Sequence, residues 1–167
     1  MFTALLISEG LIMRSMFLAA ALAAIATPAG IAQTCDAEPT LVGHRTANGT
    51  VRAQYNAVER GEWPNVVLIG EGLVETGLSS RNKTAAWSNL CAGYAGSGEY
   101  EAAVSACGEA LALRDNAWRA LNNRGAAHWL AGNTEAALAD FRAADAASTG
   151  EDEVTANLAM ASCTSAN

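Results

Sequence analysis

The feature that most constrains this chain is an internal repeat of 34 residues in its second half. The stretch that begins at Ala85 aligns without a gap with the stretch that begins at Arg119. Both stretches carry apolar residues at helical spacing on either side of a glycine, which predicts a helix, a tight turn and an antiparallel helix in each unit. The pairs that stand 34 positions apart are Asn89–Asn123, Tyr94–His128, Gly98–Gly132, Ala103–Ala137, Cys107–Phe141 and Ala110–Ala144.

Both units resemble the tetratricopeptide repeat (TPR), which has Trp, Leu, Gly and Tyr on its first helix and a small residue, an aromatic and another small residue on its second. The departures are Cys91 where Gly is usual, Arg124 where Leu is usual and His128 where Tyr is usual. The resemblance implies an all-α fold, a short right-handed α-solenoid with a C-terminal capping helix. The matching residues are Trp87, Leu90, Tyr94, Gly98, Tyr100, Ala103 and Ala110, and then Gly125, Gly132, Ala137, Phe141 and Ala144.

The same register divides the rest of the chain. The Gly-Glu-Trp of residues 61–63 resembles the Gly-Glu-Tyr of residues 98–100, which lies 37 positions later and marks a degenerate first repeat. Asn157 stands a further 34 positions beyond Asn123, in a stretch that would form a last helix covering the final repeat. We therefore expect repeats over 47–83, 84–117 and 118–151, followed by a capping helix over 152–164.

The N-terminal region reads as a targeting segment followed by a tail. From Met13, one arginine, a short apolar run and small residues follow in the order of a secretory signal peptide, which predicts a signal over 1–32 with cleavage after Ala32. Translation would then start at Met13 or Met16, and an uncleaved membrane anchor is the alternative. Residues 33–46 are expected to form a flexible tail, and the mature protein to be periplasmic or secreted.

Charge and composition exclude several classes of function. The chain has 10 Lys and Arg against 17 Asp and Glu, a formal charge of −7, whereas nucleic-acid binding needs a basic patch. Neither a nucleophile–His–acid set nor a glycine-rich phosphate loop is present, so we expect no enzyme and no cofactor. His128 is expected to be packed in the core rather than to act as a general base. The cysteines lack metal-type spacing, so no metal site is expected.

Four cysteines in an exported chain suggest disulfides. Cys91 lies seven residues before the turn at Gly98 and Cys107 nine after it, so the two should face each other across a helical hairpin. We predict a Cys91–Cys107 disulfide, with two buried thiols as the alternative. Cys35 and Cys163 could pair only if the tail folds back along the repeats; intermolecular pairing and free thiols are the other possibilities.

The TPR resemblance implies that one stripe of the first helices lines a concave peptide-binding groove. Asn89, Asn123 and Asn157 would form a ladder of amides on this stripe, able both to donate to and to accept from an extended backbone. Alternatively these amides satisfy local backbone groups, and Trp129 covers a seam between repeats instead of anchoring a ligand. The carboxylate clamp known in the family is not expected here, because the required residues are incomplete. The candidate groove residues are Asn89, Arg119, Asn122, Asn123, Trp129 and Asn157.

These features favour a non-catalytic module that binds a peptide or protein segment in its groove, with no nucleic-acid partner and no stable membrane insertion after signal cleavage. The first alternative is a self-assembling structural protein, stacked or linked by disulfides into a homo-oligomer. The second alternative is an enzyme. The partner's identity and the oligomeric state are not contained in the sequence.

Overall fold

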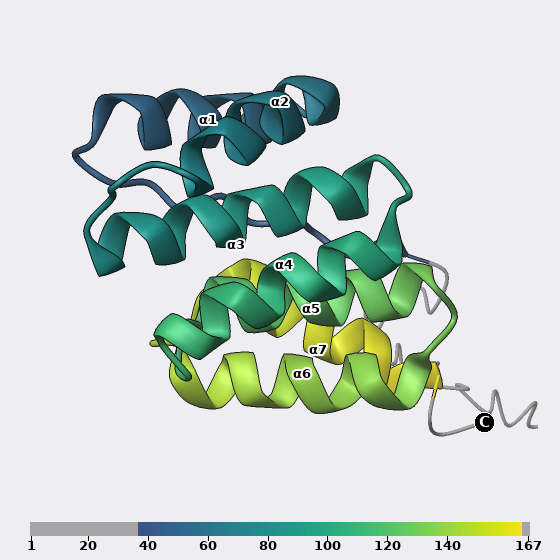
Figure 1. The fold of residues 1–167 in the computed structure, drawn as a ribbon. Helices are drawn as coiled ribbons and strands as arrows, with labels where there is room; N and C mark the ends of the chain where they lie inside the picture. Colours follow the sequence, from purple (N-terminus) through teal and green to yellow (C-terminus); the bar gives the residue numbers. More distant parts are fainter. Residues whose placement is uncertain (1–36, 165–167) are drawn as a thin grey trace, which may run out of the picture. The chain divides into compact units, whose positions relative to one another are not determined.

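The computed structural model describes residues 37–164, all within one compact unit that spans Gln33–Asn167. The predicted signal peptide and Cys35 lie outside the described residues. Within this range the chain is all-helical, as predicted, and contains no strand. The helices are α1 (Gly49–Glu59), α2 (Trp63–Val74), α3 (Ser80–Gly96), α4 (Tyr100–Leu113), α5 (Trp118–Leu130), α6 (Thr134–Ala147) and α7 (Asp152–Thr164) (Figure 1).

Consecutive helices form hairpins that pack side by side. The turns of the first three hairpins contain Gly61, Gly98 and Gly132 at positive φ, a conformation that glycine adopts without a steric penalty. Helices α1, α3, α5 and α7 contact one another in succession, while α2, α4 and α6 each pack between two of them. The first helices of the hairpins therefore form one layer, which we call the inner layer, and its order follows the sequence.

The core between the layers is built mostly from alanine, which lets the helices approach closely. Buried alanines such as Ala103, Ala110, Ala137 and Ala144 have no exposed surface and stand at the repeated positions of the sequence. Larger hydrophobic side chains are fewer in the core, and the largest that are fully buried are Phe141 and Leu90. A tightly packed core of small residues leaves little room for added volume.

One equivalent position in the three hairpins is filled in three different ways. In the third hairpin Gly125 of α5 lies against the ring of Phe141 of α6. In the second, 34 positions earlier, the disulfide partners Cys91 and Cys107 take these two places. In the first, another 37 positions earlier, the amide of Gln54 on α1 occupies the space above Gly70 on α2 and donates to the carbonyls of Val66 and Ala86. A large residue on either helix, or a covalent bridge, thus closes each hairpin.

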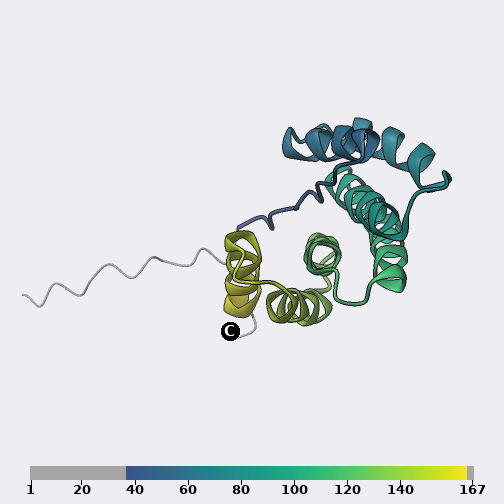
Figure 2. The ribbon, with the colours of Figure 1, turned by 90° about the vertical axis from the view of Figure 1, so that its left-hand side faces the viewer.

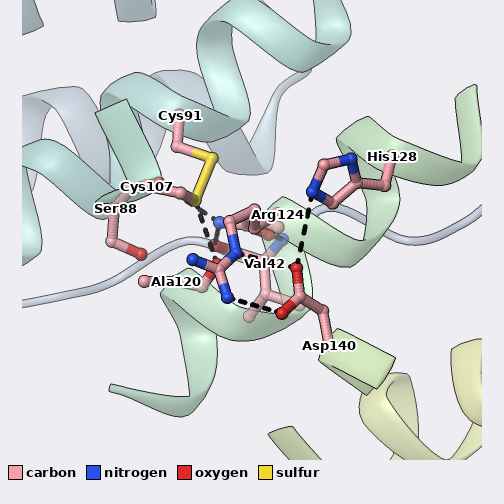
Figure 3. Close-up of a disulfide and its surroundings, with 9 residues drawn as sticks. Val42, Ser88, Cys91, Cys107, Ala120, Arg124, His128 and Asp140 are labelled. Atoms are coloured by element: carbon pink, nitrogen blue, oxygen red, sulfur yellow. Dashed lines mark hydrogen bonds and ion pairs between the residues drawn. A yellow bond between two sulfur atoms is a disulfide. The ribbon is translucent and has the colours of Figure 1, made fainter. Parts of the chain in front are cut away.

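The disulfide between Cys91 and Cys107 confirms the prediction from the sequence. Its S–S distance is 2.12 Å and its Cα atoms are 5.2 Å apart, with both residues fully buried (Figure 3). It joins α3 to α4 across the turn at Gly98 and closes a loop of 16 residues.

Removing this disulfide should lower the free energy of unfolding by about 2–3 kcal/mol, because the closed loop restricts the unfolded chain. The change is the Cys91→Ala/Cys107→Ala double variant, measured by urea denaturation. The oxidised wild-type protein is the reference, because reducing it would also break the disulfide of Cys163. A double variant as stable as the oxidised wild type would show that the bridge does not stabilise the fold.

The segment before α1 has a defined extended path. Residues 37–46, which we call the strap, cross the inner layer from α7 to the start of α1 (Figure 2). The sequence predicted a flexible tail over 33–46; the structure instead holds the described part of that tail by hydrogen bonds to α3, α5 and α7. Among residues 37–164, no helix is both long and apolar enough to cross a membrane.

Candidate functional site

The candidate site is the face of the inner layer that carries the predicted ladder of asparagines. Asn89 lies on α3, Asn122 and Asn123 on α5, and Asn157 on α7. All four side chains are buried, with exposed fractions of 0–2%. Four buried amides need partners, because an unpaired buried polar group costs free energy.

The partners are backbone groups of the strap. Asn157 Oδ1 accepts from the Thr40 N–H at 2.8 Å, and its Nδ2 donates to the Thr40 carbonyl at 2.9 Å. Asn123 binds Val42 in the same manner at 2.8 and 2.9 Å, and Asn89 binds His44 at 2.6 and 3.1 Å. Each amide thus contacts both the N–H and the carbonyl of one residue, and the three contacted residues alternate along the strap. This geometry holds an extended backbone whatever its side chains are.

Asn122 and Ser88 tie the ladder together. Asn122 Nδ2 donates to the Thr40 carbonyl at 3.0 Å, and its Oδ1 accepts from Asn157 at 2.9 Å. Asn123 also donates to the Ser88 carbonyl at 3.2 Å. The last two bonds do not involve the strap, and they help to orient the amides of Asn122, Asn123 and Asn157 toward it.

The strap residues that lie between these hydrogen-bonded positions pack against the helices. Pro39 and Gly43 are buried, and Leu41 packs against three of the four apolar clusters of the core. A Cβ at Gly43 would lie 2.7 Å from the ring of Tyr55, so the neighbouring ring would have to move for any larger residue. The strap therefore presents an aliphatic residue followed, two positions later, by a residue without a side chain.

His44 ends the contacted part of the strap and lies in an electropositive setting. Burial, followed by the charges of Arg119, Arg114 and Arg81, lowers the pKa of His44 from 6.5 to about 4. The imidazole is therefore neutral while the strap is bound at neutral pH, and its buried Nδ1 has no hydrogen bond to any of residues 37–164.

Acid should loosen the strap through His44. Because the bound state has the lower pKa, the stabilisation is complete above pH 6.5 and is lost as the pH falls from 6.5 towards 4. We expect hydrogen exchange of the Val42 and His44 amides, corrected for its intrinsic pH dependence, to show opening that is more than about tenfold more frequent at pH 4.5 than at pH 7.5.

The control for this pH effect is His44→Gln, which keeps a polar side chain but does not titrate in this range. Its strap should open equally often at both pH values, apart from effects that the wild type shares. An equal pH response in His44→Gln and the wild type would assign the effect to other groups.

Arg119 and Trp129 lie away from the ladder's hydrogen bonds. The Arg119 guanidinium is half-buried and stacks 3.9 Å above the ring of Trp118. Its Nε has no hydrogen-bond partner in the part of the chain that the structure describes. Trp129 is partly buried against the cluster that contains Phe141 and Met160. Its place fits the alternative that it covers a seam between helices, while Arg119 borders the strap at His44.

The two unusual residues of the third repeat, Arg124 and His128, meet at Asp140. Arg124 donates from Nε and Nη2 to the Asp140 carboxylate at 2.7 and 2.6 Å, and His128 Nε2 lies 3.9 Å from the same group (Figure 3). The ion pair explains why a charged residue can replace the usual leucine at position 124. Because Arg124 already occupies both carboxylate oxygens, the arrangement is that of a structural ion pair across α5 and α6.

The remaining chemistry of the described residues is sparse. No group of His, Cys, Asp and Glu suited to a metal ion occurs within 37–164. Cys163 is disulfide-bonded, and Cys35 lies outside the described range. A hollow of about 670 Å³ opens beside the strap at Pro39 and Leu41, between the turns of the first two hairpins.

The strap residues themselves were not predicted as part of the site. Leu41, Gly43 and His44 pack the strap against the inner layer, yet they stand in a stretch without helical periodicity. The available signal was the sequence Pro-Thr-Leu-Val-Gly at 39–43, in which a proline and a glycine flank residues suited to an extended chain.

A scan against models of known protein families finds no match to this chain, and a search of curated proteins finds no similar sequence.

Proposed function

We propose that this chain is an exported, non-catalytic protein-interaction module of the TPR type, a right-handed solenoid of three repeats closed by α7. The gap-free 34-residue register and the ordered inner layer support this assignment. The signal-like N-terminus and the buried disulfide support export.

Its inner layer binds an extended polypeptide segment. The observation that carries this proposal is the paired contact of Asn157, Asn123 and Asn89 with the N–H and carbonyl of alternate strap residues. Main-chain hydrogen bonds of this kind supply affinity for any extended chain, while the side-chain positions between them supply selectivity.

The strap acts as the module's own occupant of this site. A segment joined to its site by a short connection has an effective concentration in the millimolar range. A partner must therefore bind more tightly than the strap, or meet the module under conditions that loosen it. Such a site stays closed until the correct segment arrives.

The test uses the full mature chain, tagged and incubated with extract from the compartment that contains it. We expect a stoichiometric partner that is lost when Asn89 and Asn123 are both replaced by alanine, and that a peptide of residues 37–46 displaces. Circular dichroism of the double variant checks that the helices persist.

The matched control is Asn56→Ala, the same chemical change at an exposed position of the inner-layer helix α1, which should retain the partner. Recovery of nothing stoichiometric with the wild type, or equal recovery with the Asn89/Asn123 variant, would contradict binding at the ladder. A chain that recovers only copies of itself would instead support the self-assembling alternative, with straps exchanged between copies.

A further inference from the structure

The place where His44 lies has the properties of a binding site for a negative charge. A pocket of about 130 Å³ opens beside the imidazole. Arg119 is one of the lining residues, and its buried Nε has no hydrogen-bond partner among the described residues. The pocket is lined by His44, Arg114, Asn116, Ala117, Trp118, Arg119 and Ala147, a set without any acidic residue.

The charges around this pocket are unevenly distributed. Glu151 and Glu153 partly compensate the charge of Arg119 and line a neighbouring hollow with it, but no carboxylate of the described chain lines the pocket beside His44. Arg119, Arg114 and Arg81 all act electrostatically to disfavour a proton on His44. A neutral imidazole is tolerated in this setting, but it offers the arginines no counter-charge.

A carboxylate in place of the His44 imidazole would supply a counter-charge and hydrogen-bond acceptors to Arg119 and Arg114. Arginine binds carboxylates through two parallel N–H donors, and such charge-assisted bonds are stronger than neutral ones. Arg114 donates its Nε to Asn116 and keeps its terminal nitrogens for another acceptor.

We propose that strap position 44 is a subsite for a side-chain carboxylate. The segment that the inner layer binds is then extended and carries an aliphatic residue, a glycine two positions later, and Asp or Glu directly after the glycine. This inference rests on the proposed function and names the class of its ligand. The chain's own strap matches the first two positions through Leu41 and Gly43, and departs from the third at His44.

The subsite can be tested in the full mature chain without any added ligand. His44→Glu should make opening of the strap at least about fivefold rarer than His44→Gln, measured at pH 7 as hydrogen exchange of the Val42 amide. This difference between His44→Glu and His44→Gln should shrink in 0.5 M salt, where the Debye length is roughly 4 Å, because solvent ions screen a site that is only partly buried. Adding Arg119→Gln to His44→Glu should remove most of the reduction in strap opening.

The matched control is Thr40→Glu, which adds the same charge to an exposed side chain at the other end of the strap. It should leave exchange within about twofold of the wild type, as expected for a surface charge. Equal or faster exchange in His44→Glu than in His44→Gln, or an equal gain in Thr40→Glu, would overturn the subsite.

A second arm separates this inference from the proposed function. Labelled peptides EPTLVGERT and EPTLVGQRT are titrated into the full chain carrying Val42→Pro, which loses a strap hydrogen bond. Tighter binding of the glutamate peptide supports the subsite, and equal affinities overturn it. Binding of neither peptide contradicts the proposed function, while the exchange data on the strap still decide the preference at position 44.

Discussion

Replacing Gly125 with valine should lower the free energy of unfolding by about 3 kcal/mol, because the new side chain has no space. A Cβ at this position would lie 2.8 Å from two ring carbons of Phe141 and 3.2 Å from the carbonyl oxygen of Ala137. Phe141 is fully buried and cannot turn away, and the carbonyl belongs to the backbone of α6. Urea denaturation followed by circular dichroism measures the loss.

The matched control is Gly108→Val on α4, where an added Cβ would meet nothing within 4 Å. It makes the same chemical change within a helix and should alter stability by less than about 1 kcal/mol. Phe141→Ala should weaken the effect of Gly125→Val, because the clash disappears with the ring. Equal losses at positions 125 and 108 would contradict this account of the third hairpin.

The repeat explains why much of the fold could be predicted from the sequence. A fixed register of 34 residues predicted the helical hairpins, and the distances of Cys91 and Cys107 from the turn at Gly98 predicted the disulfide. The first hairpin was harder to read, because Gly70 stands where a bulky residue is usual. The structure shows that Gln54 supplies the missing bulk from the facing helix. Reading one helix at a time cannot detect an exchange of volume between two.

Of the candidate site, the ladder of asparagines could be predicted from the sequence, but the strap that it binds could not. The ladder of asparagines repeats with the helices, and its two-way hydrogen bonding indicated an extended backbone as its partner. That partner lies elsewhere in the sequence: the contacts of Asn89, Asn123 and Asn157 span 45, 81 and 117 positions. The conformation of the strap depends on tertiary contacts rather than on local preference, so its sequence carries no periodic pattern that predicts it.

Contact through the backbone makes proline the most damaging residue in the strap. Val42→Pro should raise the frequency of strap opening by more than about 100-fold, corresponding to about 3 kcal/mol or more. The Val42 N–H donates to Asn123 Oδ1 at 2.8 Å; proline has no N–H, and its ring would enter the space between these atoms. Asn123 Oδ1 would then remain buried without that donor. The rate of tryptic cleavage after the exposed Arg45 measures opening of the strap.

Val42→Ala is the control, since it shortens the side chain but keeps the N–H. If the backbone contact holds the strap, Val42→Ala should be cleaved after Arg45 within a few-fold of the wild-type rate, while Val42→Pro is cleaved far faster with its helical content intact. The released strap should also expose the ladder, so that a separate peptide of residues 37–46 binds Val42→Pro and not Val42→Ala. Cleavage of both variants at the same rate would mean that side-chain packing, led by Leu41, holds the strap instead of the asparagines.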